Sequence, residues 1–183
     1  SKYKHICAVF DFHSEIDYNL NKKKRINNWK NNKTFYKLID FLTNNQKNVF
    51  FIIKSKDYNY MNLDYFENII AVLKKKPNVI FANSIENFSA YKVLSVSTFS
   101  VCRYSSLCEE MSYFNFPYAI YDEIGFLKQT NFNKYMTIFN NNNEINKWIS
   151  NLISKKMYYN FKKLLPSKNY KTKNNFQNII ENI

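Results

Sequence analysis

The sequence contains little of what several specialised classes of protein require. It has one glycine (Gly125), three prolines, three cysteines and two arginines among 183 residues. No apolar run approaches the roughly 20 residues that span a bilayer, and the first residues do not follow the pattern of a signal peptide. We therefore expect a soluble cytoplasmic chain, long enough for one ordinary domain with a core of its own.

The cysteines exclude two common kinds of site. Cys7, Cys102 and Cys108 lie far apart or inside predicted buried elements, which gives neither a disulfide framework nor zinc-ligand spacing. We interpret them as small core residues in a reducing compartment. No metal and no resident cofactor are predicted.

Charge is the next constraint, because the formal net charge is +13 and the pI is near 9.5. Such an excess suits nucleic acid, an anionic membrane surface or a phosphorylated ligand. Arg25 and Arg103 are the only arginines, and no arginine-rich, aromatic-interleaved element occurs. The lysines also accompany abundant Asn, Ile, Phe and Tyr, a composition that A/T-rich coding favours. Nucleic acid is thus the least favoured partner, whereas the basic run 22–25 could contact the inner face of a membrane.

Strands and helices alternate along the chain. Such alternation is typical of βαβ units and a parallel sheet, so we predict an α/β fold: a three-layer Rossmann-like doubly wound parallel sheet of five to six strands with helices on both faces. One domain spans 1–166, and a polar tail spans 167–183. The predicted strands are 6–11, 48–54, 78–82, 96–101 and 118–121; the helices are 35–42, 63–75, 86–94, 106–114, 143–153 and 157–165, with loops at 12–33 and 140–143 and Thr34 as an N-cap.

Polar residues follow three of these strands. Lys54, the corner from Asp11 to His13, and the pair Ser105-Ser106 all come where a strand ends. In parallel sheets ligands bind at the carboxyl ends of the strands. A helix that begins after Ser105-Ser106 also presents unpaired N–H groups and the positive end of its dipole to an anion. This layout predicts a phosphate site, with Glu110 one turn further on and near enough for ribose hydroxyls.

The segment 104–117 (Tyr-Ser-Ser-Leu-Cys-Glu-Glu-Met-Ser-Tyr-Phe-Asn-Phe-Pro) resembles the donor-site motif of GT-B glycosyltransferases and related glycerophosphotransferases of bacterial surface-polysaccharide synthesis. That motif has two hydroxyl residues, three residues of any kind, a glutamate, and a glycine-any-proline turn before a strand. The segment 51–54 likewise resembles the family's strand that ends in lysine. The resemblance covers about residues 4–155 in element order.

The resemblance implies a role for each matching residue. Ser105 and Ser106 would bind the donor pyrophosphate, Glu110 would hold the ribose diol, and Lys54 would neutralise phosphate charge. Tyr104, at the head of the motif, is placed with these donor-binding residues, and His13 joins them from the loop after the first strand. The donor would be a nucleotide-sugar or a CDP-polyol that serves as substrate, and the acceptor a glycan or lipid-linked molecule.

Two positions depart from the family pattern. Cys102 stands where the retaining branch has an acidic residue, which favours an inverting transfer or no catalysis in this chain. Asn115 replaces the turn glycine, and asparagine tolerates the left-handed region better than most residues. The resemblance places the catalytic base of inverting enzymes on an N-terminal acceptor domain. We therefore interpret the chain as the donor-binding part of a two-domain enzyme, with no catalytic residue assigned.

Two other functions stay open. The chain could be a non-catalytic α/β module that binds a nucleotide or packs against a partner, or a basic nucleic-acid-binding domain. Each candidate residue also has a purely structural interpretation: Ser105-Ser106 as an N-cap, Glu110 and Lys54 as solvated surface groups, and His13 as an ordinary loop histidine.

Overall fold

A computed structural model describes residues 2–11, 22–55, 64–82, 89–125, 127 and 136–154, with the backbone alone for 22–32. Its strands form one sheet of six, all parallel, in the order β3-β2-β1-β4-β5-β6. The predicted doubly wound parallel sheet is therefore confirmed. The strands are β1 (His5–Phe10), β2 (Val49–Lys54), β3 (Val79–Phe81), β4 (Phe99–Cys102), β5 (Tyr118–Tyr121) and β6 (Ile138–Phe139).

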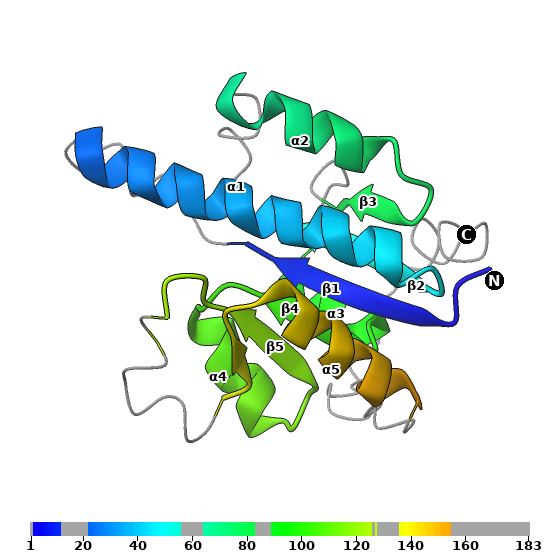
Figure 1. Cartoon of the computed structure of the whole chain (residues 1–183). Helices are drawn as coiled ribbons and strands as arrows, with labels where there is room; N and C mark the ends of the chain where they lie inside the picture. Colours follow the sequence, from blue (N-terminus) through cyan, green and yellow to red (C-terminus); the bar gives the residue numbers. More distant parts are fainter. Residues whose placement is uncertain are drawn as a thin grey trace.

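Helices cover both faces of the sheet, as Figure 1 shows. One face carries α1, α2 and α5, and the other carries α3 and α4. This arrangement makes three layers, as right-handed crossovers between parallel strands require. The helices are α1 (Lys22–Asn45), α2 (Asp64–Lys74), α3 (Ala90–Val96), α4 (Ser106–Tyr113) and α5 (Asn142–Ser154).

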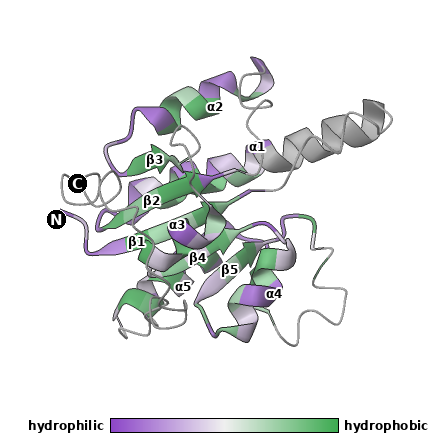
Figure 2. Ribbon diagram, turned by 180° about the vertical axis from the view of Figure 1, so that it is seen from behind, coloured by the Kyte–Doolittle hydropathy of each residue, from purple (hydrophilic) through white to green (hydrophobic). Residues whose placement is uncertain are grey.

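The central strands are apolar on both sides because helices bury both faces. In β1, Cys7 and Val9 face α1 and α5, whereas Ala8 and Phe10 face α3 and α4. The hydropathy colouring in Figure 2 shows the strands as the most hydrophobic layer, whereas the helices contain both hydrophobic and hydrophilic residues. The core is therefore two apolar layers, one on either side of the sheet.

The predicted loop 12–33 and the Thr34 N-cap are wrong in part. The helix α1 begins at Lys22, so Thr34 lies inside it. Lysine and arginine are good helix formers, and neither glycine nor proline interrupts the segment 22–45. Among the α1 side chains that the structure describes, Phe35, Tyr36 and Leu38 are buried, and the sequence pattern revealed only this second half of the helix.

Other boundaries shift by a few residues. The third helix begins at Ala90 because Ser89 caps it, its Oγ accepting from the Lys92 N–H at 3.2 Å. The strand that follows is 99–102 rather than 96–101. The predicted loop 140–143 is shorter than expected, because α5 begins at Asn142. The predicted helix 157–165 and the tail 167–183 lie outside the described residues.

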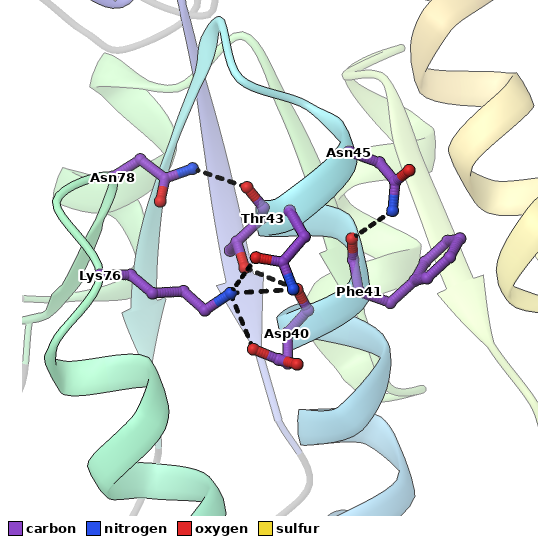
Figure 3. A network of polar contacts seen from close by, with 7 residues as sticks. Asp40, Phe41, Thr43, Asn45, Lys76 and Asn78 are labelled. Atoms are coloured by element: carbon purple, nitrogen blue, oxygen red, sulfur yellow. Dashed lines mark hydrogen bonds and ion pairs between the residues drawn. The ribbon is translucent and has the colours of Figure 1, made fainter.

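A polar network closes the carboxyl end of α1 against the α2–β3 turn (Figure 3). The buried Asn78 amide donates to the Thr43 carbonyl at 3.1 Å and to the Val49 carbonyl at 3.3 Å. Lys76 Nζ pairs with Asp40 Oδ1 at 2.8 Å. Carbonyls in the last turn of a helix have no partner within the helix, so this network supplies donors from a neighbouring element.

We expect Asn78→Ala to lower the free energy of unfolding by about 1–3 kcal/mol, because it leaves two carbonyls without this donor in a buried place. Urea unfolding followed by circular dichroism measures the change. Asn45→Ala is the matched control, since the Asn45 amide is exposed and donates to the Phe41 carbonyl within the same helix. An equal effect of the two substitutions would contradict the assigned role of Asn78.

The helix α4 ends in a Schellman motif. The Phe116 N–H donates to the Met111 carbonyl at 2.8 Å and the Asn115 N–H to the Ser112 carbonyl at 3.0 Å. Asn115 has φ of +53°, the left-handed conformation predicted for it. The turn directs Phe116 into the core and starts β5 at Tyr118.

We expect Asn115→Val to destabilise the fold by about 1–2 kcal/mol, because a β-branched residue is strained at positive φ. Asn115→Gly should change stability by no more than a few tenths of a kcal/mol. Thermal unfolding of both variants tests the difference. Equal melting temperatures for valine and glycine at this position would show that its backbone conformation carries no strain.

Candidate functional site

The carboxyl edge of the sheet has its switch point between β1 and β4. From β1 the chain builds outward through β2 and β3, then returns to place β4 on the other side of β1. The Arg103 N–H donates to the Phe10 carbonyl at 2.9 Å, which joins the two strand ends. In doubly wound sheets ligands bind in the crevice at such a point.

Ser105 and Ser106 lie at this edge, where the topology predicted them. Ser105 occupies the N-cap position of α4 in an extended conformation, and its carbonyl accepts from the Cys108 N–H at 2.9 Å. Its side chain makes no capping hydrogen bond to the helix. Ser106, the first residue of α4, is exposed. Ser105 is half-buried, so Ser106 is the more accessible of the two, and N-capping by the Ser105 hydroxyl does not explain the pair.

Glu110 and Tyr104 are each held by a neighbouring side chain. The Tyr91 hydroxyl, from α3, donates to Glu110 Oε2 at 2.5 Å. The Tyr104 hydroxyl donates to Glu109 Oε1 at 2.8 Å. The first bond connects α3 with α4, and the second connects the β4–α4 turn with α4. Contact of Glu110 with ribose, and of Tyr104 with a donor, remains a prediction.

Lys54 ends β2 at the same level as the switch point. The register aligns Lys54 with Phe10, and Phe10 with Cys102. Neighbouring strands lie about 4.8 Å apart, so the backbones of Lys54 and Cys102 are about 10 Å apart. Lys54 Nζ donates to the Ser55 carbonyl at 2.9 Å. Burial lowers the pKa of Lys54, and the Asp11 carboxylate opposes that shift. His13 lies outside the described residues.

The structure adds a buried cluster that the sequence did not assign. Asp11 follows β1, and its Oδ2 accepts from the Tyr36 hydroxyl at 2.5 Å and from the Ser55 hydroxyl at 2.6 Å. Burial raises the pKa of Asp11 to about 7, although the two hydroxyls and the Arg103 charge act in the opposite direction. The cluster therefore joins α1, β1 and β2 beneath the edge, around a carboxyl group that titrates near neutral pH.

Arg103 is the second group that the sequence did not assign. It follows β4, and burial lowers the pKa of its guanidinium, whereas the nearby Glu123, Asp11 and Asp122 carboxylates raise it. Its charge is therefore shared among carboxylates at the ends of β1 and β5. The sequence placed the corner that begins at Asp11 at this edge, and Ser55 and Arg103 could have been found because each lies within two residues of the end of a predicted strand. Nothing in the sequence showed that the Tyr36 hydroxyl reaches Asp11.

Within the ranges that the structure describes, neither a metal cluster nor a membrane-spanning helix occurs. Nowhere in it do three or more histidine, cysteine, aspartate or glutamate side chains gather as a metal site would require. The helices within the same ranges include none that combines the length and the apolar character needed to cross a membrane.

Comparisons with known proteins establish the fold. No protein-family model matches the sequence, and no curated protein matches it. Among solved structures, the co-structure of S. aureus MnaA with UDP superposes with a TM-score of 0.51 at 12% identity. The match covers 87% of this chain and 39% of that chain. The protein is similar to the MnaA chain in its Rossmann-like α/β fold, and it spans well under half of that chain's length.

We expect stability to fall as pH rises between about 4 and 7. The Asp11 carboxyl keeps its proton up to about pH 7 when folded, whereas its ordinary pKa is 3.8. The folded state therefore binds more protons than the unfolded state across this window, and stability decreases with pH there and levels off above it. Asp11→Asn should flatten the profile, measured by urea unfolding at a series of pH values. An unchanged slope would contradict a buried, protonated Asp11.

Proposed function

We propose that this chain binds the diphosphate of a nucleotide-activated donor at the β4–α4 turn, as the donor-binding part of a GT-B type transferase. The observation that carries the proposal is the position of Ser105 and Ser106. They lie at the switch point of a parallel sheet, at the start of a helix, and the Ser105 hydroxyl is not used to cap that helix.

Charge at the edge supports an anionic ligand. Lys54 ends β2 and Arg103 directly follows β4, and these two strands lie on either side of β1. Three carboxylates act on Arg103, whereas Asp11 is the one that acts on Lys54. Of the two cations, Lys54 is therefore the better candidate to neutralise phosphate charge. The chain as a whole carries +13, which raises the local concentration of any anion.

The UDP-bound MnaA chain, similar in fold, supports a nucleoside diphosphate as the ligand. The donor would be a nucleotide-sugar or CDP-polyol, and its sugar or polyol-phosphate group would be transferred to a glycan or lipid-linked acceptor at the inner face of a membrane. The family resemblance places an acceptor domain and the catalytic base outside this chain. The same resemblance, with Cys102 in place of an acidic residue, favours inversion.

The chemistry follows from where charge develops. When a nucleoside diphosphate leaves a sugar carbon, negative charge builds on its phosphate oxygens. Helix N–H groups, serine hydroxyls and a lysine that are already in place stabilise that charge without reorganising. Glu110 could reach ribose if the ligand replaced the Tyr91 hydroxyl as its hydrogen-bond donor.

A second candidate, a non-catalytic module, is favoured by one observation. Glu110 already accepts from Tyr91, and Tyr104 already donates to Glu109, so both predicted donor contacts have partners within the fold. In this alternative the two bonds only fix α3 and α4. Nucleotide binding, where present, would then not depend on Glu110.

Isothermal titration of the 183-residue protein with UDP, CDP, ADP and inorganic pyrophosphate tests the proposal. We expect one site, about tenfold weaker in Ser106→Ala, since a hydrogen bond to a charged group contributes about 1.5 kcal/mol or more. Ser106→Asp should abolish binding by repulsion and keep the fold stable, because a carboxylate suits a helix N-terminus.

Ser95→Ala is the matched control, since the Ser95 hydroxyl donates to the Lys92 carbonyl within α3. Glu110→Gln distinguishes the two candidate functions. If Glu110 binds ribose, the substitution should weaken the binding of UDP more than the binding of pyrophosphate, which has no ribose. Absence of binding, or binding unchanged in both Ser106 variants, would overturn the proposed site.

A further inference from the structure

Two cysteines that are six positions apart in the sequence touch beneath the β4–α4 turn. Cys102 is the last residue of β4 and Cys108 the third of α4, and their Sγ atoms lie 3.5 Å apart. Both are free thiols, and each is 1% exposed or less. Their burial agrees with the expected role in the core, but the sequence did not show their contact.

The separation of the sulfur atoms is that of unbonded neighbours. A disulfide bond is about 2.05 Å long, so the two atoms need to approach by about 1.5 Å. Carbonyls hold each thiol in place: Cys102 Sγ donates to the Ala119 carbonyl and Cys108 Sγ to the Arg103 carbonyl, both at 3.6 Å. A bond between the sulfurs would break this arrangement and pull the first turn of α4 toward the end of β4.

The segment between the two cysteines is the turn of the candidate site. It contains Ser105 and Ser106, and the Cys108 N–H itself donates to the Ser105 carbonyl. A change in the position of Cys108 therefore moves the backbone that carries both hydroxyls. The two sulfurs are placed to control the shape of this turn.

We propose that Cys102 and Cys108 form a reversible disulfide that changes the conformation of the β4–α4 turn. With a peroxide as oxidant, one thiolate attacks a peroxide oxygen, forming a sulfenic acid and releasing water. The second thiol then attacks that sulfur, forming the disulfide and releasing a second water. In sum, two thiols lose two electrons and two protons, and one hydrogen peroxide becomes two water molecules.

The surroundings favour Cys108 as the thiol that reacts first. The contact with the Cys102 thiol and hydrogen bonds with Ser105 lower the pKa of Cys108. The pKa of Cys102 is raised, by its hydrogen bond to Cys108 and by burial. Cys7 provides an internal control, because it lies on the other face of the sheet and burial raises its pKa.

Peptide mapping tests the bond directly. Trypsin cleaves after Arg103, which separates the two cysteines into peptides 93–103 and 104–128, with Cys7 in peptide 5–22. After treatment with hydrogen peroxide and alkylation, we expect peptides 93–103 and 104–128 to be linked, and dithiothreitol to release them. Cys102→Ser and Cys108→Ser should each abolish the link, whereas Cys7→Ser should preserve it.

Three results of the peptide mapping would contradict the proposed disulfide. Full alkylation of Cys102 and Cys108 after oxidation would overturn the proposal, as would irreversible oxidation of either residue or a link to Cys7. Circular dichroism of the two serine variants shows whether they fold. If they do not, mapping of the unaltered protein and of Cys7→Ser still decides the question.

The effect on the turn is measured by hydrogen exchange of peptides from 104–116 in the oxidised and reduced protein. We expect the exchange rates of these amides to change at least threefold on oxidation and to return on reduction. A disulfide without such a change would overturn the proposed control of the turn. This readout needs no ligand.

One consequence rests on the proposed function. Oxidation should weaken UDP binding at least tenfold, with recovery on reduction, and saturating UDP should slow oxidation of the buried pair. If the reduced protein binds no UDP, the donor site fails while the mapping and exchange results stand. If it binds UDP equally in both states, the disulfide has no role at that site.

Discussion

The position of β1 between β2 and β4, paired in parallel with both, is the constraint on which the rest of the structure depends. Parallel pairing places three carboxyl ends at one level, and in-register alignment of Lys54, Phe10 and Cys102 fixes which residues come next. Asp11, Ser55 and Arg103 meet there because each follows a strand of this set. The polar edge is therefore a product of strand order, assembled from residues that are remote in sequence.

Local electrostatics at this edge differ from those of the whole chain. The net charge is +13, yet three of the groups that act on Arg103 are carboxylates, at Asp11, Asp122 and Glu123. A charge buried without a partner is strongly unfavourable, and hydroxyl groups and one guanidinium offset this penalty for Asp11. The carboxylates thus largely offset the charge of Arg103 at this edge, and contact of Ser105, Ser106 and Lys54 with an anion is part of the proposed function.

Sequence reasoning succeeded where the signal is local. Apolar runs placed β1, β2 and β5, the spacing of Phe66, Ile70 and Leu73 placed α2, and the position of Asn115 at the turn glycine of the resembled motif anticipated its left-handed backbone. It failed where packing or long-range contact decides. The first half of α1 has no apolar period to detect, and the contacts of Tyr36 with Asp11 and of Cys102 with Cys108 arise only when strands and helices assemble.

Exposure decides which carboxylates at this edge could serve a ligand. Tyr91 is 47% exposed, so the hydrogen bond that it gives to Glu110 competes with water and contributes little net stability. A ribose hydroxyl could replace it at small expense. The Tyr36 and Ser55 hydroxyls that donate to Asp11 are buried, and removing either would take one of these two donors from a carboxyl group that is itself buried. Glu110 therefore suits exchange with a ligand, whereas Asp11 suits a fixed role in holding α1 and β2 to the edge.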